Sequence, residues 1–113
     1  MNGRSTIDQT FGDTASVYQT SSAVDAVSII TQGGAWVNHA NSASVVQSGT
    51  TDKSTITQTG TNMLASVNQS GIVNASTISQ TGDFHTAVVS QASDGVVSTI
   101  TQTGAGNVTY VSQ

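Results

Sequence analysis

The sequence predicts an all-β fold: a β-solenoid of five strand-turn-strand rungs, about 22 residues each, in which two parallel, in-register sheets face a thin core. Three observations predict it. Ten glutamines lie on one grid, and from Gln47 to Gln113 they recur every 11 residues. Two positions before each glutamine stands a β-branched residue, which alternates between Ile and Val, so the full repeat has two similar halves. Each half ends in five residues of period-two alternation, which indicates a strand rather than a helix.

The predicted strands follow two templates. The first, Ser-x-Ile-x-Gln, is expected in the first half of a rung and occupies 5–9, 54–58, 76–80 and 98–102. The second, Ala-x-Val-x-Gln with small variations, occupies 15–19, 43–47, 65–69, 87–91 and 109–113. Side chains two residues apart share a face of a strand. We therefore expect Ser or Ala, Ile or Val, and Gln to form a narrow core.

Three columns of residues are expected to stack along this core. The glutamine column comprises Gln9, Gln19, Gln32, Gln47, Gln58, Gln69, Gln80, Gln91, Gln102 and Gln113. The aliphatic columns comprise Ile7, Ile30, Ile56, Ile78 and Ile100, and Val17, Val45, Val67, Val89 and Val111. An unpaired amide in a dry core costs about 1–3 kcal/mol, whereas amides stacked in register can donate and accept along a ladder. The glutamine ladder is therefore expected to fix the register and to support self-assembly.

Glycines follow most of the glutamines at two positions' distance, where a tight turn with positive φ is expected. The predicted turn residues are Gly60, Gly71, Gly82, Gly104 and Asn107. Residues 1–4 are expected to form a stub, and the rungs to cover about 5–27, 28–53, 54–75, 76–97 and 98–113. Uneven glutamine spacing before Gln47 predicts arcs of different length, with the segment around Trp36 a bulged turn or, alternatively, a recognition site. At about 4.8 Å per rung, the stack should span roughly 24 Å.

The composition suits a thin core. Of the 113 residues, 35% are hydrophobic, 4% aromatic and 7% charged, so neutral polar side chains must be buried. There is no cysteine for a disulfide or thiolate metal site and no proline to interrupt a backbone ladder. A pI near 4.4 gives no electrostatic reason to expect nucleic acid as a partner, and no apolar run approaches the roughly 20 residues of a membrane span. The start Met1–Arg4 is not a secretory signal, so an exported protein would be a mature form with an added Met.

Both ends of the predicted stack are open. No capping helix, proline or charged edge strand is expected before residue 5 or after Gln113, although solenoids normally protect their terminal rungs. Each end would expose unpaired backbone and an open glutamine ladder, which template the addition of another chain. We therefore expect the monomer to be one segment of an indefinite filament.

The grid resembles the curlin repeat of bacterial curli subunits, which form extracellular functional amyloid. Gln102, Gly104, Asn107 and Gln113 fall in register with that repeat, as do Gln58, Gly60, Ala65 and Gln69, and Gln80, Gly82, Ala87 and Gln91. At the family's Asn position the chain has Asn41 and Asn107 but also Asp13, Met63 and His85. The resemblance implies a major or minor fibre subunit, exported unfolded through an outer-membrane secretion apparatus. It also implies a nucleator or major-subunit counterpart, and polymerisation at the cell surface into a matrix for biofilm and adhesion.

Other functions find little support. His39 and His85 lie in predicted turns without companions at ligand spacing, so no enzyme, cofactor or metal site is predicted. The aspartates do not recur at one repeat position, which favours solubilising turn residues over Ca²⁺ ligands. The alternative function is ice binding by an outward Thr-x-Thr array, as at Thr55 with Thr57 and Thr99 with Thr101, although Asp8 and Ile29 interrupt the array in the first two rungs.

Overall fold

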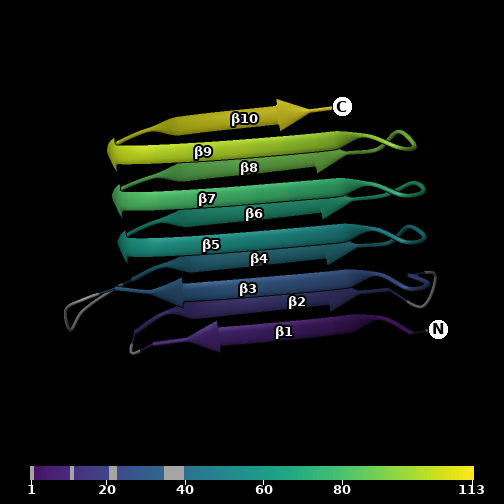
Figure 1. The fold of residues 1–113 in the computed structure, drawn as a ribbon, viewed down its shortest axis with the longest axis horizontal. Helices are drawn as coiled ribbons and strands as arrows, with labels where there is room; N and C mark the ends of the chain where they lie inside the picture. The colour runs from purple at the N-terminus through teal and green to yellow at the C-terminus, as the bar shows by residue number, and fades with distance from the viewer. Residues whose placement is uncertain (1, 11, 21–22, 35–39) are drawn as a thin grey trace.

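The computed structural model describes residues 2–10, 12–20, 23–34 and 40–113. These ranges form ten strands and no helix, with the two termini at opposite ends of a stack (Figure 1). The strands are Arg4–Gln9 (β1), Thr14–Gln19 (β2), Val27–Gly33 (β3), Ser42–Gln47 (β4), Lys53–Thr61 (β5), Leu64–Gln69 (β6), Ala75–Asp83 (β7), Thr86–Gln91 (β8), Val97–Ala105 (β9) and Val108–Ser112 (β10). Trp36 and His39 lie outside the described residues.

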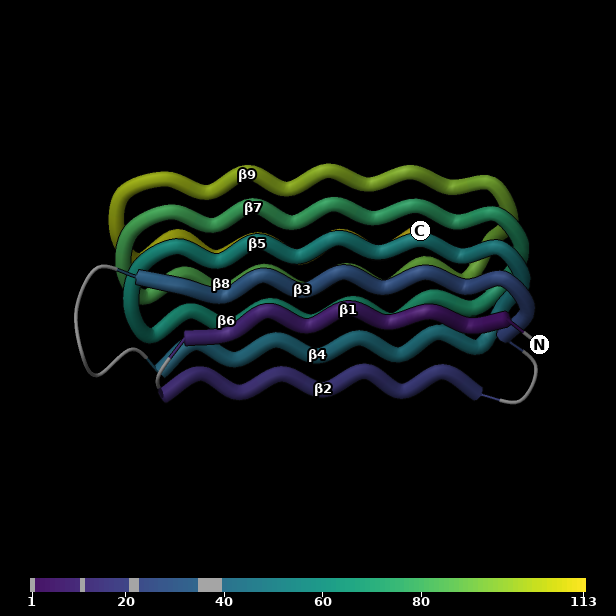
Figure 2. Tube along the Cα trace, turned by 60° about the horizontal axis from the view of Figure 1, so that its bottom comes forward, coloured from purple at the N-terminus to yellow at the C-terminus, as the bar shows by residue number. Residues whose placement is uncertain are grey.

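The strands form two five-stranded parallel sheets. Sheet A has the order β1-β3-β5-β7-β9 and sheet B the order β2-β4-β6-β8-β10, so the chain changes sheet at every turn (Figure 2). The register places like residue over like residue: Ile56 pairs with Ile78 and Gln58 with Gln80 in sheet A, and Val67 pairs with Val89 in sheet B. The predicted all-β solenoid of about five turns is confirmed.

The dimensions agree with this stack. The Cα atoms extend over 38 × 24 × 12 Å. In Figure 1, which looks down the shortest axis, the strands run along the longest axis and the rungs stack along the intermediate one. The 24 Å extent therefore matches the predicted height of five rungs, and the 12 Å extent accommodates two sheets packed about 10 Å apart.

The strand ends differ from the sequence prediction. The sheet A strands begin at Arg4, Val27, Lys53, Ala75 and Val97, one residue before each predicted rung. β5, β7 and β9 also continue past the glutamine, because Gly60, Gly82 and Gly104 pair with one another in register. These glycines do have positive φ, at 139°, 122° and 102°. They are nevertheless the ends of strands and not the turns that we predicted, whereas Gly71 and Asn107 lie between strands.

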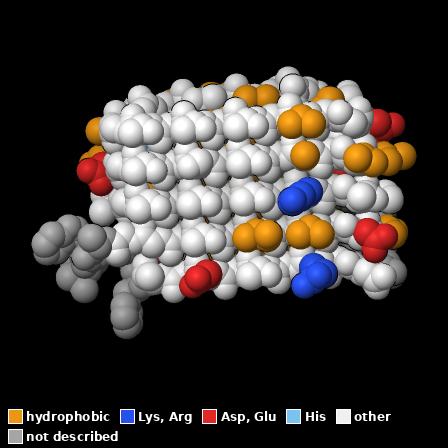
Figure 3. Space-filling model, viewed as in Figure 1, with side chains coloured by type: hydrophobic (Ala, Val, Ile, Leu, Met, Phe, Trp, Pro, Cys, Tyr) orange, Lys and Arg blue, Asp and Glu red, His pale blue; other side chains and the backbone are white. Residues whose placement is uncertain are grey.

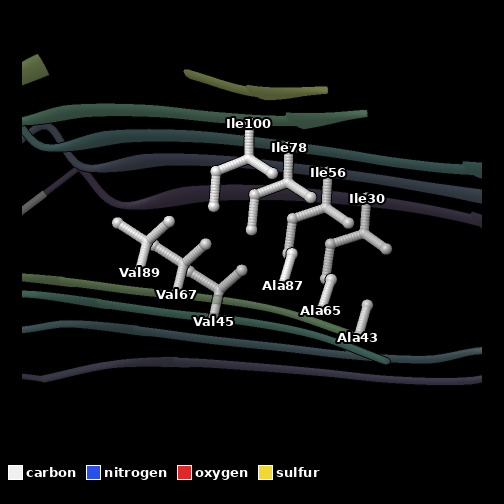
Figure 4. Close-up of a cluster of buried hydrophobic side chains, with 10 residues drawn as sticks. All are labelled: Ile30, Ala43, Val45, Ile56, Ala65, Val67, Ile78, Ala87, Val89 and Ile100. Atoms are coloured by element: carbon white, nitrogen blue, oxygen red, sulfur yellow. The ribbon is translucent and has the colours of Figure 1, made fainter. Parts of the chain in front are cut away.

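The core follows the predicted alternation. Ser54, Ile56 and Gln58 of β5 are buried and the residues between them face outward. In the interior rungs, the isoleucine column of sheet A faces the valine and alanine columns of sheet B (Figure 4). The first rung is the exception, because every residue of β1 is exposed. Ile7 is 43% exposed, whereas Ile30 and Ile56 are fully buried.

Candidate functional site: the glutamine ladders and the end rungs

The glutamines of sheet A form one continuous hydrogen-bonded ladder, here called ladder A. Each Nε2 donates to the Oε1 of the glutamine in the next rung, at distances between 2.7 and 2.9 Å. The ladder runs from Gln9 through Gln32, Gln58 and Gln80 to Gln102. An in-register parallel sheet puts these amides one strand spacing apart, which is what amide-to-amide bonding needs.

Sheet B contains the matching ladder B. It runs from Gln19 through Gln47, Gln69 and Gln91 to Gln113. The first three Nε2 to Oε1 distances are 2.9 Å and the last is 3.3 Å. In both ladders every amide donates toward the C-terminal rung. The two ladders therefore have the same direction.

Eight of the ten glutamines, all except Gln9 and Gln113, also join the two sheets within the described part of the chain. The second Nε2 proton is donated to a backbone carbonyl of the facing sheet, as from Gln58 to Ser42 O at 3.2 Å and from Gln69 to Lys53 O at 3.0 Å. Sequence reasoning missed these bonds, although the position of each glutamine at the end of its template, beside the crossing to the facing sheet, was a signal for them. A buried glutamine amide with both protons bonded avoids the penalty of an unsatisfied polar group. The ladders thus fix both the register within a sheet and the pairing between sheets.

The two ends of the stack are chemically different. At the first rung, no described glutamine donates to the Oε1 atoms of Gln9 and Gln19, so both ladders begin with an open acceptor. At the last rung both ladders end in Nε2 donors. Gln102 Nε2 donates to Thr86 O and to Thr109 Oγ1, each at 3.0 Å. Thr109 stands in register with Ala87, and its hydroxyl takes the place of the next glutamine in ladder A.

A second set of columns stabilises the turns. Asn41 Oδ1 accepts from the backbone N–H of Met63 and Asn74 Oδ1 from that of Val96, each at 3.1 Å. Each of these hydrogen bonds joins two adjacent rungs. Asn41 belongs to the family's Asn position that the sequence identified, whereas Asn74 was not singled out. Such bonds supply acceptors for backbone donors that the strand ladders leave open.

His85 belongs to the same column as Asn41 and is fully buried. Its Nδ1 accepts from the backbone N–H of Asn107 at 3.2 Å, so Nδ1 carries a lone pair. Its Nε2 lies 3.0 Å from Thr81 O and must donate to that carbonyl. The ring is therefore the neutral Nε2–H tautomer. It acts as a structural bridge between rungs.

Asp52 corrects the interpretation of the aspartates as surface residues. Its side chain is fully buried, and burial raises the pKa of its carboxyl above the ordinary value. The backbone N–H groups of Asn74 and Gly49 only partly oppose this rise in pKa. Oδ1 accepts from Asn74 N at 3.1 Å, but Oδ2 has no hydrogen bond of good geometry. The turn preceding β5 thus buries a carboxyl group with one unpaired oxygen.

The outer face of sheet A carries a regular hydroxyl grid. In three consecutive rungs, three outward positions are occupied by hydroxyl side chains in register: Thr55, Thr57, Thr59, Thr77, Ser79, Thr81, Thr99, Thr101 and Thr103. Figure 3 shows these as flat rows that are neither charged nor hydrophobic. Ile29 and Asp8 interrupt the same columns in the first two rungs.

Within the described ranges, no three or more His, Cys, Asp or Glu side chains gather in a group that could hold a metal ion. The described part of the chain also contains no helix with the length and apolar character that crossing a bilayer requires.

Fold and ladders together define a parallel β-solenoid whose rungs are tied by buried glutamines. The family model of the curlin associated repeat matches residues 39–71, so over this segment the chain is similar to curlin-repeat proteins. The matched segment contains β4, β5 and β6, where the regular 11-residue spacing begins. No curated protein shows a significant match to the chain.

Proposed function

We propose that this protein is a self-assembling subunit of an extracellular, curli-like amyloid fibre that contributes to biofilm matrix and adhesion. The observation that carries the proposal is the pair of glutamine ladders, which run in one direction through all five rungs and are open at the first. The curlin associated repeat supports the assignment to this class of fibre. A structural role of this kind needs no catalytic residue and no cofactor.

End-to-end addition continues contacts that the chain already makes between its own rungs. β1 and β9 are the edges of sheet A, and β2 and β10 are the edges of sheet B. Exposed parallel edges are templates for further strands. A copy stacked on the first rung would cover Ile7, whose counterparts Ile30 and Ile56 are fully buried. Burial of apolar area stabilises by roughly 25 cal/mol per Å², which favours this addition.

The proposed partners follow from the same role. The main partner is the protein itself, in a homopolymeric fibre. The curlin repeat further suggests a nucleator or major-subunit counterpart and an outer-membrane secretion apparatus, with the fibre at the bacterial cell surface.

X-ray diffraction from aligned material tests the assembly. After incubation of the purified chain near neutral pH, we expect reflections near 4.8 Å along the fibre axis and about 10 Å across it. Persistent monomers at high concentration, with no such reflections, would contradict the proposal.

Substitution of the terminal glutamines tests whether the ladders template growth. Gln113→Ala removes the donor that an incoming Gln19 carbonyl would need, and Gln102→Ala removes the donor that an incoming Gln9 carbonyl would take over from Thr109 Oγ1. Since a hydrogen bond contributes about 0.5–1.5 kcal/mol, we expect the critical concentration for fibre growth to rise about 2- to 10-fold. The matched control changes Thr55 and Thr99 to Ser on the outer face and should leave growth unchanged. Equal growth in the glutamine variants and the control would exclude ladder templating.

The hydroxyl grid favours a second candidate function, binding to ice. The hydroxyl rows of the grid repeat along the stack at the spacing between strands. A crystal surface such as ice also has a regular repeat, so a regular array of hydroxyl groups can contact it at many points. Thermal hysteresis of the soluble chain decides between the candidates. Hysteresis that is lost in a variant with Thr77 and Thr99 changed to Val, in a chain that forms no fibres, would favour ice binding.

A further inference from the structure

The chain's two tyrosines lie at opposite ends of one face. Tyr18 is on β2 in the first rung and Tyr110 is on β10 in the last rung, both on the outer face of sheet B. Their side chains are 63% and 71% exposed, so neither is covered within the monomer. An exposed aromatic side chain is a common anchor of protein interfaces.

Apolar neighbours accompany each tyrosine. Tyr18 pairs with Val46 in the second rung, and Tyr110 pairs with Val88 in the fourth. The other residues in these two columns are small or polar: Ser16, Ser44, Ser66, Asn68, Ser90 and Ser112. Within these columns the apolar side chains are therefore concentrated at the two ends of the stack.

The direction of the ladders selects which ends can meet. Both ladders begin with Oε1 acceptors at the first rung and end in an Nε2 group at the last rung, where Gln102 Nε2 donates to Thr109 Oγ1 within the monomer. Stacking the last rung of one copy on the first rung of another joins donors to acceptors in both ladders once Gln102 exchanges Thr109 Oγ1 for the incoming Gln9 Oε1. Joining two like ends would bring donors to donors or acceptors to acceptors, and would leave buried amide groups unsatisfied.

We propose that copies join head to tail, with Tyr110 of one copy against Tyr18 of the next. This inference rests on the fibre assembly proposed above. Continuation of the register within sheet B pairs Tyr110 with Ser16 of the next copy and Ser112 with Tyr18 of the next copy. The two tyrosines then lie on one face, one strand and two residues apart, a diagonal of about 8 Å. Aromatic side chains reach across such a diagonal, and the serines leave room for both rings.

The resulting junction contains four apolar side chains. Val88 and Tyr110 of one copy adjoin Tyr18 and Val46 of the next, which makes a continuous apolar patch across a face that is otherwise polar in these columns. A repeating junction between unlike ends produces an open filament and not a closed dimer. The patch thus marks the subunit boundary along the fibre.

Oxidative coupling of tyrosines tests the junction directly. Fibres and monomers are illuminated in the presence of a ruthenium tris-bipyridyl complex and persulfate. Each tyrosine phenol loses one electron and one proton, and persulfate accepts the electrons and is reduced to sulfate. The two tyrosine rings then form a carbon–carbon bond. We expect peptides containing Tyr18 linked to Tyr110 from fibres and not from monomers. Links of Tyr110 to Tyr110 or of Tyr18 to Tyr18 would overturn the head-to-tail junction. Cross-β fibres without any Tyr18–Tyr110 link would overturn it too and leave the proposed function standing, whereas a failure to form fibres would overturn both.

The critical concentration for growth provides the second measurement. Tyr18→Ser and Tyr110→Ser should each raise it about 2- to 10-fold, as the loss of an aromatic pair implies. The matched control is Leu64→Ser, which removes an exposed apolar side chain from the same face in the middle rung. Leu64→Ser should leave the critical concentration unchanged, and an equal rise in this control would overturn the junction.

Discussion

Asp52 is a buried carboxyl group at a position where the next rung has an amide, that of Asn74. Asn74 stacks on it, accepts from the backbone N–H of Val96 through Oδ1, and donates through Nδ2 to Ser70 O at 3.2 Å. Asp52 makes the equivalent acceptor bond to Asn74 N, but its Oδ2 has no proton to donate when ionised. Asn74 and Asp52 thus differ in one atom: Asn74 has Nδ2, which is hydrogen-bonded, where Asp52 has Oδ2, which is not.

We predict that Asp52→Asn stabilises the fold at neutral pH. The new Nδ2 would reach Ser48 O as Asn74 Nδ2 reaches Ser70 O, and the buried charge would be removed. An unsatisfied buried group costs about 1–3 kcal/mol, so we expect the free energy of unfolding at pH 7 to rise by about that amount in urea titrations of the monomer.

The stability gained by Asp52→Asn is expected to depend on pH, and the raised pKa of Asp52 gives the direction of this dependence. Because desolvation raises the folded-state pKa of Asp52 above 3.8, the folded protein binds more protons than the unfolded chain just above that pH. The contribution of the neutral carboxyl is present below the ordinary pKa and is lost as pH rises through the folded-state pKa. The advantage of Asp52→Asn should therefore grow between acid and neutral pH. Asp8→Asn, the same charge change on exposed β1, is the control; an equal pH-dependent gain there would contradict the mechanism.

The hydrogen bonds of Asp52, His85 and Thr109 were the least predictable part of the site. The repeat places His85 at the Asn position and Thr109 in a strand template, but it does not show that Asp52 and His85 are fully buried, or which groups the three side chains bond to. Their surroundings come from the adjacent rungs: His85 bonds to Asn107, one rung away. The glutamines were predictable because their repeat spacing itself implies stacking. The function of these glutamines in assembly remains a prediction that the Gln102 and Gln113 variants test.

At the scale of the element, sheet A strands end where glycines approach each other's backbone. A Cβ at Gly82 would lie 1.9 Å from Gly104 O, and one at Gly60 would lie 1.8 Å from Gly82 O. At Gly104 a Cβ would meet nothing within 4 Å. The three positions share a positive φ but differ in the space above them, because Gly104 is in the last strand of the sheet.

This difference predicts unequal effects of alanine. Gly104→Ala should lower the free energy of unfolding by about 1–3 kcal/mol through backbone strain alone. Gly82→Ala carries the same strain and also pushes the Gly104 carbonyl away, which should cost about 1–3 kcal/mol more. Thermal unfolding of the two monomeric variants measures the difference. Equal melting temperatures would show that the strand ends relax freely.

Strand positions were predictable to within a few residues, but the reversals of the chain were not. The glycine spacing predicts turns at Gly60 and Gly82, whereas the chain reverses two residues later, where Asn62 and Phe84 have positive φ. A bulky residue in that region is uncommon, and single-residue preferences argue against it. Stacking overrides that preference, because Phe84 N donates to Thr61 O in the rung before it.

For the whole molecule, directional ladders and low charge combine into one property. The stack has a distinct first and last rung, and the protein has a net charge of −4 with only two basic residues. At the first end lie Arg4, Asp8 and Asp13, with Asp25 nearby; the strands of the last rung carry no charged side chain, with Asp83 and Asp94 nearby. The approaching ends therefore both carry net negative charge, which slows association through electrostatic repulsion.

Salt should accordingly accelerate growth at pH 7. Net charges of −2 and −2 about 12 Å apart in water repel by roughly 1.4 kcal/mol before screening. Raising the ionic strength from about 0.01 M to 0.15 M shortens the screening length from roughly 30 Å to 8 Å and so lowers this repulsion by about 0.6 kcal/mol. Seeded elongation should therefore become about 3-fold faster. Near the pI of 4.4 this salt dependence should disappear. Slower elongation with salt at pH 7 would mean that attraction, such as Arg4 approaching Asp94 of the preceding copy, dominates the junction.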